Sequence, residues 1–159
     1  MKYRSEIDGL RAVAVLPVIL FHAGFESFSG GFVGVDVFFV ISGFVIGRLL
    51  VARLASAGTV SFRSFYERRA RRLLPALGFT LVVVSLVTPL LAPIAAGATA
   101  ARTAVAAALF SANGYLYWVA GGGYFAPSAE LNPLLHTWSL SVEEQFYFVV
   151  PAALVLIWK

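Results

Sequence analysis

The sequence contains no cysteine and few charged residues. The absence of cysteine excludes disulfides, thiolate nucleophiles and metal sites with cysteine ligands. Only 13% of the residues are charged, compared with about a quarter in an average soluble domain. In contrast, 60% of the 159 residues are hydrophobic, more than a soluble chain of this length can bury. The composition therefore predicts an all-α fold of polytopic transmembrane helices.

Apolar runs predict four to five transmembrane spans or re-entrant segments, because a span needs about 20 mostly apolar residues. The first two spans are expected at about 10–25 and 32–51, and the third begins at Leu73. A weaker, alanine-rich segment at 103–120 either crosses or re-enters, and a last apolar helix begins near Ser141. Since the sequence stops inside that helix, we expect residues 1–159 to be the N-terminal part of one membrane domain that continues further.

Basic residues predict the orientation of these segments. Six arginines lie between the second and third spans and Arg48 lies near the end of the second, opposed only by Glu67. Loops rich in Lys and Arg stay on the cytoplasmic side. We therefore expect a multi-pass protein of the cell inner (plasma) membrane with a cytoplasmic N-terminus. If segment 103–120 crosses, His136 lies on the cytoplasmic side. If it re-enters, His136 lies on the outer side and Lys159 returns to the cytoplasm.

Ionisable residues in the first two predicted spans are candidates for chemistry. Arg11 and His22 are 11 residues apart, which places them on one helix face about 16 Å apart along the axis. An ionisable residue within a span usually faces a partner or cavity. A structural alternative is a neutral, hydrogen-bonded His22 with Arg11 reaching the membrane surface. Asp36 either complements the dipole of a helix start or orients His22 across the hairpin.

The arginine-rich run at 67–72 is a candidate anion site. Arg69 and Arg72 are i, i+3 neighbours on a helix and can converge on one anion, for which the planar guanidinium of arginine is suited. A phosphorylated cytoplasmic substrate is one interpretation, and lipid headgroups are the other. Nucleic acid is not an expected partner, because the run is attached to a span.

The segment 136–147 combines structural and chemical signals. Ser141 and Glu144 fit a capping box at the start of the last helix. His136, Ser139 and Glu143 are left for binding or acid–base work near a membrane boundary. There is no G-x-S-x-G motif for a serine hydrolase, and no spacing of His and carboxylates that matches a zinc site, so no metal is predicted.

Four segments, in this order, resemble the acyltransferase 3 family of integral membrane O-acyltransferases. The first is Arg4-Ser5-Glu6-Ile7-Asp8-Gly9-Leu10-Arg11-Ala12, with ten residues between Arg11 and His22. The others are the run 31–44 (GFVGVDVFFVISGF), the run 69–75 (RARRLLP) and residues 136–147 (HTWSLSVEEQFY). The resemblance covers nearly the whole chain, and the combination is far more specific than any single piece. Family domains have about ten spans, so this chain corresponds to a part of one, which we expect to be inactive alone.

The resemblance implies transfer of an acyl group, commonly acetyl, from cytoplasmic acyl-CoA to a hydroxyl of an extracytoplasmic glycan or lipid-linked saccharide. The acyl-CoA would be a substrate and not a resident cofactor. The family's motif residues fall on Arg11 and His22, on Arg69 and Arg72, and on Ser139, Ser141 and Glu143.

From the residues and the resemblance together we assign two sets of roles. The expected catalytic residues are His22, Asp36 and Glu143, and the expected substrate-binding residues are Arg11, Arg69, Arg72, His136 and Ser139. His22 would act as general base on the acceptor hydroxyl or carry the acyl group briefly. The alternative functions are a membrane transporter, a lipid- or glycan-binding membrane protein, and a structural membrane subunit.

Overall fold

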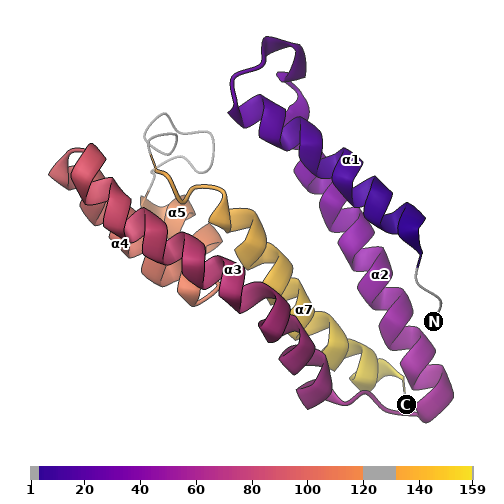
Figure 1. The fold of residues 1–159 in the computed structure, drawn as a ribbon. Helices are drawn as coiled ribbons and strands as arrows, with labels where there is room; N and C mark the ends of the chain where they lie inside the picture. Colours follow the sequence, from indigo (N-terminus) through magenta and orange to yellow (C-terminus); the bar gives the residue numbers. More distant parts are fainter. Residues whose placement is uncertain (1–3, 120–131, 159) are drawn as a thin grey trace. The chain divides into compact units, whose positions relative to one another are not determined.

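The computed structural model describes residues 4–119 and 132–158, and every long element in these ranges is a helix (Figure 1). This confirms the predicted all-α class. The chain forms two compact units: the first consists of the residues up to Thr59 together with the segment from Ile157 onward, and the second runs from Val60 to Leu156.

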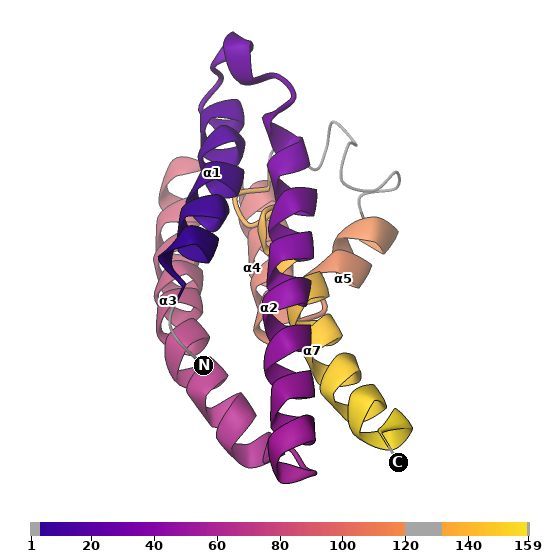
Figure 2. The same cartoon turned by 90° about the vertical axis from the view of Figure 1, so that its right-hand side faces the viewer.

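The first unit is a helical hairpin. Helix α1 (Ser5–His22) and helix α2 (Gly34–Ala57) lie side by side in both views, joined by the short 3-10 helices η1 (Glu26–Phe28) and η2 (Gly31–Val33) (Figures 1 and 2). Glycine is required where the hairpin is tightest. A Cβ atom on Gly34 would lie 2.1 Å from the carbonyl oxygen of Ala14, and one on Gly31 would lie 2.1 Å from that of Pro17.

Helix α1 differs from the predicted first span in its position. It begins at Ser5 rather than near residue 10, so it includes the charged residues Glu6, Asp8 and Arg11. Its 18 residues extend about 27 Å, close to the thickness of a bilayer's hydrocarbon core. Its first turns are therefore polar and the rest of the helix is apolar up to His22.

The polar segment 52–72 consists of two helix ends and a short turn. Helix α2 ends at Ala57, where Gly58 adopts a left-handed φ of 66° and its N–H donates to the carbonyl of Leu54. Helix α3 (Phe62–Leu91) then runs for 30 residues, or about 45 Å. Because this exceeds a hydrocarbon core of about 30 Å, the basic first turns of α3 extend a membrane span beyond the apolar layer.

The alanine-rich segment is broken into two short helices. Helix α4 (Ile94–Ala108) folds back along α3, and helix α5 (Ala112–Val119) follows a turn in which Phe110 has a positive φ of 51°. With 15 and 8 residues, neither helix reaches the usual length of a span. Ala106, Ala107, Ala112 and Leu116 form a buried cluster against which side chains of α3 and of helix α7 (Thr137–Ile157) pack.

Helices α3 and α7 run antiparallel. The hydroxyl of Tyr66, near the start of α3, donates to the carbonyl of Tyr147, whereas Leu81 packs on the same cluster as Leu135 and Trp138 at the start of α7. The start of α7 therefore lies beside the second half of α3, and the later part of α7 lies beside the start of α3. This direction agrees with the re-entrant alternative for segment 103–120, since a single crossing there would make α7 parallel to α3.

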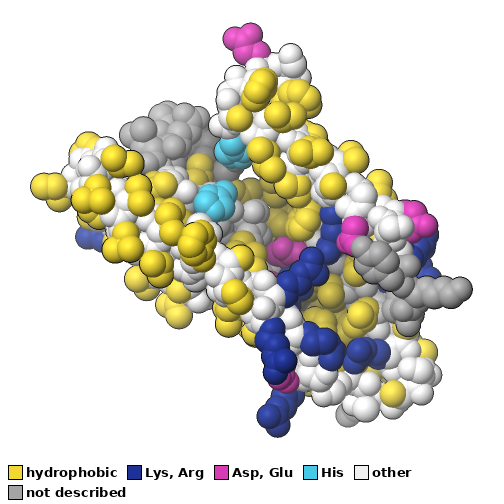
Figure 3. Space-filling view, viewed as in Figure 1, with side chains coloured by type: hydrophobic (Ala, Val, Ile, Leu, Met, Phe, Trp, Pro, Cys, Tyr) yellow, Lys and Arg dark blue, Asp and Glu magenta, His cyan; other side chains and the backbone are white. Residues whose placement is uncertain are grey.

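Three helical stretches within the described ranges are long and apolar enough to cross a membrane: Gly31–Ala57, Phe62–Leu91 and Thr137–Ile157. Large hydrophobic side chains remain exposed along the second half of α3, where Figure 3 shows a continuous hydrophobic surface. Phe79 is 72% exposed and Leu90 is 81% exposed. Exposure on this scale is typical of a surface that faces lipid or further helices.

Candidate functional site

The predicted site residues are divided between the two units. Arg11, His22 and Asp36 belong to the first unit, and Arg69, Arg72, His136, Ser139 and Glu143 belong to the second.

Arg11 lies against α2 with little of its charge satisfied. Its Nη2 donates to the hydroxyl of Ser42 at 3.1 Å, and its Cζ lies 5.4 Å from the centroid of the Phe38 ring. Its Nε is buried without a hydrogen-bond partner, and no carboxylate within 4–119 or 132–158 forms an ion pair with it. A guanidinium has five donors, so this one retains capacity for an anion.

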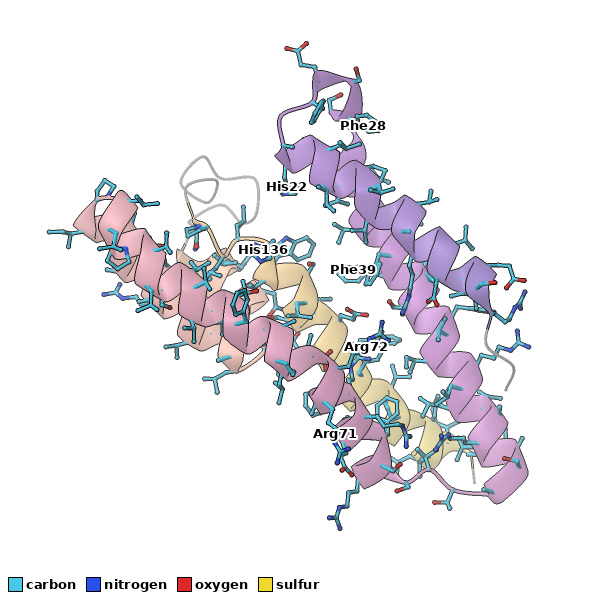
Figure 4. The ribbon with its side chains drawn as sticks, in the orientation of Figure 1. His22, Phe28, Phe39, Arg71, Arg72 and His136 are labelled. Carbon is cyan, nitrogen blue, oxygen red and sulfur yellow. The ribbon has the colours of Figure 1, made fainter. Side chains whose placement is uncertain are left out.

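His22 is the last residue of α1, three turns beyond Arg11 on the same unbroken helix (Figure 4). Its Nδ1 lies 2.8 Å from the carbonyl oxygen of Val18. Because a carbonyl only accepts, Nδ1 carries the hydrogen in this contact, and Nε2 is the nitrogen that can take up a proton. The hydrogen bond thus selects the tautomer that a general base with a reactive Nε2 requires.

Asp36 belongs to the second helix of the hairpin. It lies in the first turn of α2, which agrees with the helix-start interpretation. Gly34 faces α1, and two residues further along a helix the direction changes by about 200°, so Asp36 projects away from α1. The Nδ1 position that a carboxylate would occupy is held by Val18. The roles expected for Asp36, orienting or charging His22 across the hairpin, stay predictions.

The best-connected polar group of the second unit is the Arg69 cluster, which consists of Arg69, Glu143, Glu144 and Tyr147. Arg69 Nε lies 2.8 and 2.9 Å from the two carboxylate oxygens of Glu144, and its Nη2 lies 2.7 Å from Oε1. Arg69 Cζ is 3.3 Å from the centroid of the Tyr147 ring. One edge and one face of the guanidinium are thus in contact with α7.

Glu143 completes the Arg69 cluster from the same helix. Its Oε1 accepts a hydrogen bond of 2.6 Å from the Tyr147 hydroxyl and lies 3.8 Å from Arg69 Nη2. The side chain of Glu143 is 13% exposed and that of Glu144 is 6% exposed. Two nearly buried carboxylates therefore share one guanidinium, which leaves one negative charge in excess when both are ionised.

The other arginines of the run are in different surroundings. Arg71 pairs with Glu67 at 2.6 Å along the exposed face of α3, and Arg68 donates to the Ser64 hydroxyl. Arg72 is exposed and forms no hydrogen bond or ion pair within the part of the chain that the structure describes. Figure 4 shows Arg71 and Arg72 projecting from different sides of α3. Arg69 is turned to Glu144, and the convergence of Arg69 and Arg72 on one anion stays a prediction.

The capping-box prediction for Ser141 and Glu144 is wrong. Helix α7 begins at Thr137, so both residues lie inside it. The Ser141 hydroxyl donates to the carbonyl of Thr137 and accepts the backbone N–H of Ala112, the first residue of α5. Ser141 thus satisfies a free N–H of another helix, and Glu144 is the principal partner of Arg69.

His136 and Ser139 lie at the entry to α7. His136 is exposed in the turn that precedes the helix (Figure 4), and the Ser139 hydroxyl donates to the His136 carbonyl at 3.0 Å. Ser139 therefore stabilises the first turn of α7, and the binding roles of both residues stay predictions. Among the described residues, no group of three or more His, Asp or Glu side chains is arranged to hold a metal ion.

Ser42, Tyr66 and Tyr147 were not singled out from the sequence. Tyr147 is four residues beyond Glu143, a spacing that brings two side chains of a helix together and could have suggested their hydrogen bond. No local pattern connects Arg11 with Ser42 or Tyr66 with Tyr147, because these contacts join segments that are 31 and 81 residues apart.

The amino-acid sequence is similar to those of known O-acetyltransferases. The chain is 37% identical over 158 residues to the peptidoglycan O-acetyltransferase OatA of Listeria monocytogenes, and the match covers 99% of this chain and 25% of that protein. It is 38% identical over 156 residues to the O-acetyltransferase OatA of Staphylococcus aureus (strain NCTC 8325), covering 98% of this chain and 25% of that protein. The chain thus spans about a quarter of the length of these relatives. No solved structure matches it.

A family profile described as an acyltransferase domain matches residues 4–159. The match begins at the first described residue of the chain and includes every residue of both units discussed above. Together with three helices able to cross a membrane, it identifies a multi-pass membrane protein. The chain therefore belongs to the acyltransferase 3 family.

Proposed function

We propose that the chain is part of a membrane O-acyltransferase that moves an acyl group, in particular acetyl, from cytoplasmic acyl-CoA to a hydroxyl of a cell-surface glycan. The observation that carries the proposal is the arrangement of α1. One unbroken helix holds a guanidinium with unused donors at Arg11 and, about 16 Å further along, a histidine in a defined tautomer at His22.

The separation on α1 suits an acyl-CoA donor. The coenzyme carries phosphates at one end and the thioester at the end of an extended arm. Arg11 is a cation with unused donors that suit the phosphates. With the phosphates held near Arg11, an arm along α1 would bring the thioester toward His22.

The chemistry assigned to His22 is proton transfer at Nε2. In direct transfer, Nε2 accepts the proton of the acceptor hydroxyl while the hydroxyl oxygen attacks the thioester carbonyl. The carbon–sulfur bond then breaks, and the thiolate leaves and takes up the proton. In the covalent alternative, Nε2 attacks the carbonyl, the carbon–sulfur bond breaks and the thiolate leaves. The acceptor hydroxyl then takes the acyl group from Nε2, and its proton passes to the thiolate. Both routes use the tautomer that the contact with Val18 selects.

The acceptor proposal rests on the relatives. One of them is named as a peptidoglycan O-acetyltransferase, so a peptidoglycan or related glycan hydroxyl is the first acceptor to test. The cytoplasmic origin of the donor follows from the proposed orientation, in which the basic start of α3 lies on the cytoplasmic side of the inner membrane.

The proposal is tested with His22→Ala in the protein expressed at its natural length. Membrane vesicles receive radiolabelled acetyl-CoA and glycan acceptor, and label on the glycan is measured. Removing a general base costs about 10²–10⁴-fold in rate, so transfer should fall by at least about 100-fold. Ser29→Ala, an exposed change in the same hairpin, is the matched control and should leave transfer unchanged.

The rival functions give different results in the same vesicles. A transporter or a lipid- or glycan-binding protein would show no label on the glycan in the unaltered protein. Transfer that persists in His22→Ala, with the variant inserted at normal abundance, would remove His22 from the reaction.

A further inference from the structure

The Arg69 cluster contradicts the simplest idea about the two arginines of the motif, that both bind the same phosphate. Arg69 already uses its Nε and Nη2 donors on Glu144, at 2.7–2.9 Å, and one face of its guanidinium is on Tyr147. The planar fork of an arginine presents paired donors along an edge, and here that edge is occupied by a carboxylate. A phosphate that used this edge would have to displace Glu144, leaving a nearly buried carboxylate without its partner.

The charge of the cluster argues in the same direction. Two carboxylates, Glu143 and Glu144, lie within 3.8 Å of a single guanidinium. An approaching phosphate would meet this excess of negative charge at short range and be repelled. Arg72, three residues later on α3, is exposed and has no such carboxylate neighbours among the residues of known placement.

The geometry instead directs Arg69 toward Glu143. The Tyr147 ring lies under the guanidinium, and its hydroxyl donates to Glu143 Oε1 at 2.6 Å. Tyr147 is 1% exposed, and its backbone carbonyl accepts from Tyr66, so the ring is fixed between α3 and α7. Arg69 and the Tyr147 hydroxyl therefore hold the Glu143 carboxylate from two directions.

We infer that Arg69, Glu144 and Tyr147 are positioning residues that fix the Glu143 carboxylate for its part in acyl transfer, and that Arg72 alone of the motif pair binds the donor's phosphates. This inference rests on the proposed function. The two neighbouring arginines then have different roles: Arg69 is neutralised between α3 and α7, and Arg72 is available for a ligand.

The test is a charge exchange in the protein at its natural length. Arg69→Glu and Glu144→Arg are made singly and together, and the thermal unfolding midpoint in detergent, the kcat and the acyl-CoA KM are measured. Each single change should lower the unfolding midpoint and reduce kcat by more than about tenfold. The double change should have a kcat about tenfold higher than either single change, and a midpoint between theirs and that of the unaltered protein. If Arg69 binds phosphate instead, both variants that carry Arg69→Glu should have a raised acyl-CoA KM, and the double change should not recover kcat.

Tyr147→Phe keeps the ring and removes only the hydroxyl, so it tests positioning without unfolding the helix pair. It should lower kcat by about tenfold and leave the acyl-CoA KM unchanged, while the midpoint falls less than in the charge-reversal variants. Arg72→Ala should do the opposite, raising the acyl-CoA KM by about 10- to 100-fold with little effect on the midpoint. Arg71→Ala, which removes an exposed arginine paired with Glu67, is the control for loss of charge and should change neither constant.

The inference is overturned if Arg72→Ala leaves the acyl-CoA KM unchanged, or if Tyr147→Phe raises that KM without lowering kcat. Failure of the proposed function gives a different pattern. In that case the unaltered protein transfers no acyl group, while the unfolding midpoints of the charge-exchange set still report whether Arg69 and Glu144 form a pair.

Discussion

Arg11 illustrates how an arginine can be held in place without being neutralised. It contacts a neutral hydroxyl, that of Ser42, and an aromatic ring, that of Phe38. Ser42 is 2% exposed in the middle of α2, where a hydroxyl is unusual unless it has a partner. The contact directs the guanidinium along the hairpin while leaving its charge for an anion.

Ser42→Ala should therefore weaken donor binding. A hydrogen bond to a charged group contributes about 1.5–3 kcal/mol, so we expect the acyl-CoA KM to rise by at least about tenfold. The measurement is steady-state transfer with varied acyl-CoA. Ser56→Ala is the matched control in the same helix, because the Ser56 hydroxyl donates only to the carbonyl of Arg53 and should be dispensable. Equal effects of the two changes would show that the Ser42 contact has no part in donor binding.

At the scale of elements, the hairpin depends on two glycines that face α1. Gly34 and Gly31 let the backbones of α1 and α2 approach so closely that no side chain fits between them. This approach fixes the register of the hairpin, and with it the position of Ser42 relative to Arg11. Small residues have the same role in many membrane helix pairs.

Gly34→Ala should destabilise the hairpin, because its Cβ would lie 2.1 Å from a backbone carbonyl that cannot move independently of α1. We expect a loss of about 1–3 kcal/mol, measured as a lower thermal unfolding midpoint in detergent. Gly47→Ala, in the same helix with nothing within 4 Å, is the control. It should stabilise the protein by up to about 1 kcal/mol through helix propensity, so the two changes have opposite signs. A shared sign would contradict the close-contact argument.

The sequence predicted the existence of the helices better than their ends. Apolar runs identified α2, α3 and α7, because burial in lipid selects long apolar helices. The beginning of α7 was placed at Ser141 since Ser141 and Glu144 match a capping box, but both residues have partners in other helices. Local spacing cannot show that Arg69, 75 residues away, satisfies Glu144. The orientation of Asp36 away from α1 likewise depends on which face of α2 packs in the hairpin.

At the scale of the molecule, the antiparallel course of α3 and α7 makes a prediction about the membrane. Ser61, just before α3, and Trp158, just after α7, should be on one side, and Pro93 should be on the other. Because this chain has no cysteine, single cysteines at these positions would be unique labelling sites within it.

Ser61→Cys and Trp158→Cys should react with a membrane-impermeant maleimide only after the membrane is permeabilised, because the basic start of α3 favours the cytoplasmic side. Pro93→Cys should react in intact cells. The readout is mass-tagged protein on a gel, in a background without other cysteines. Labelling of the Trp158 variant from the same side as the Pro93 variant would exclude the proposed course of α7.

The register of α3 and α7 also has a consequence for how the protein is made. Leu135 and Trp138 pack on the same cluster as Leu81, so the turn at 132–136 lies at the level of the apolar middle of α3. Irregular backbone at such a depth must find partners inside the protein. Asn132 supplies them: its side chain accepts from the N–H of Leu134 and donates to Thr103 of α4.

These bonds require α4 to be packed before the start of α7 can settle in the apolar layer. Helices α4 and α5 are too short to be recognised as spans while the chain leaves the ribosome. Their entry into the bilayer is then a folding event that follows the insertion of α3, and biogenesis of this region should be cooperative rather than segment by segment.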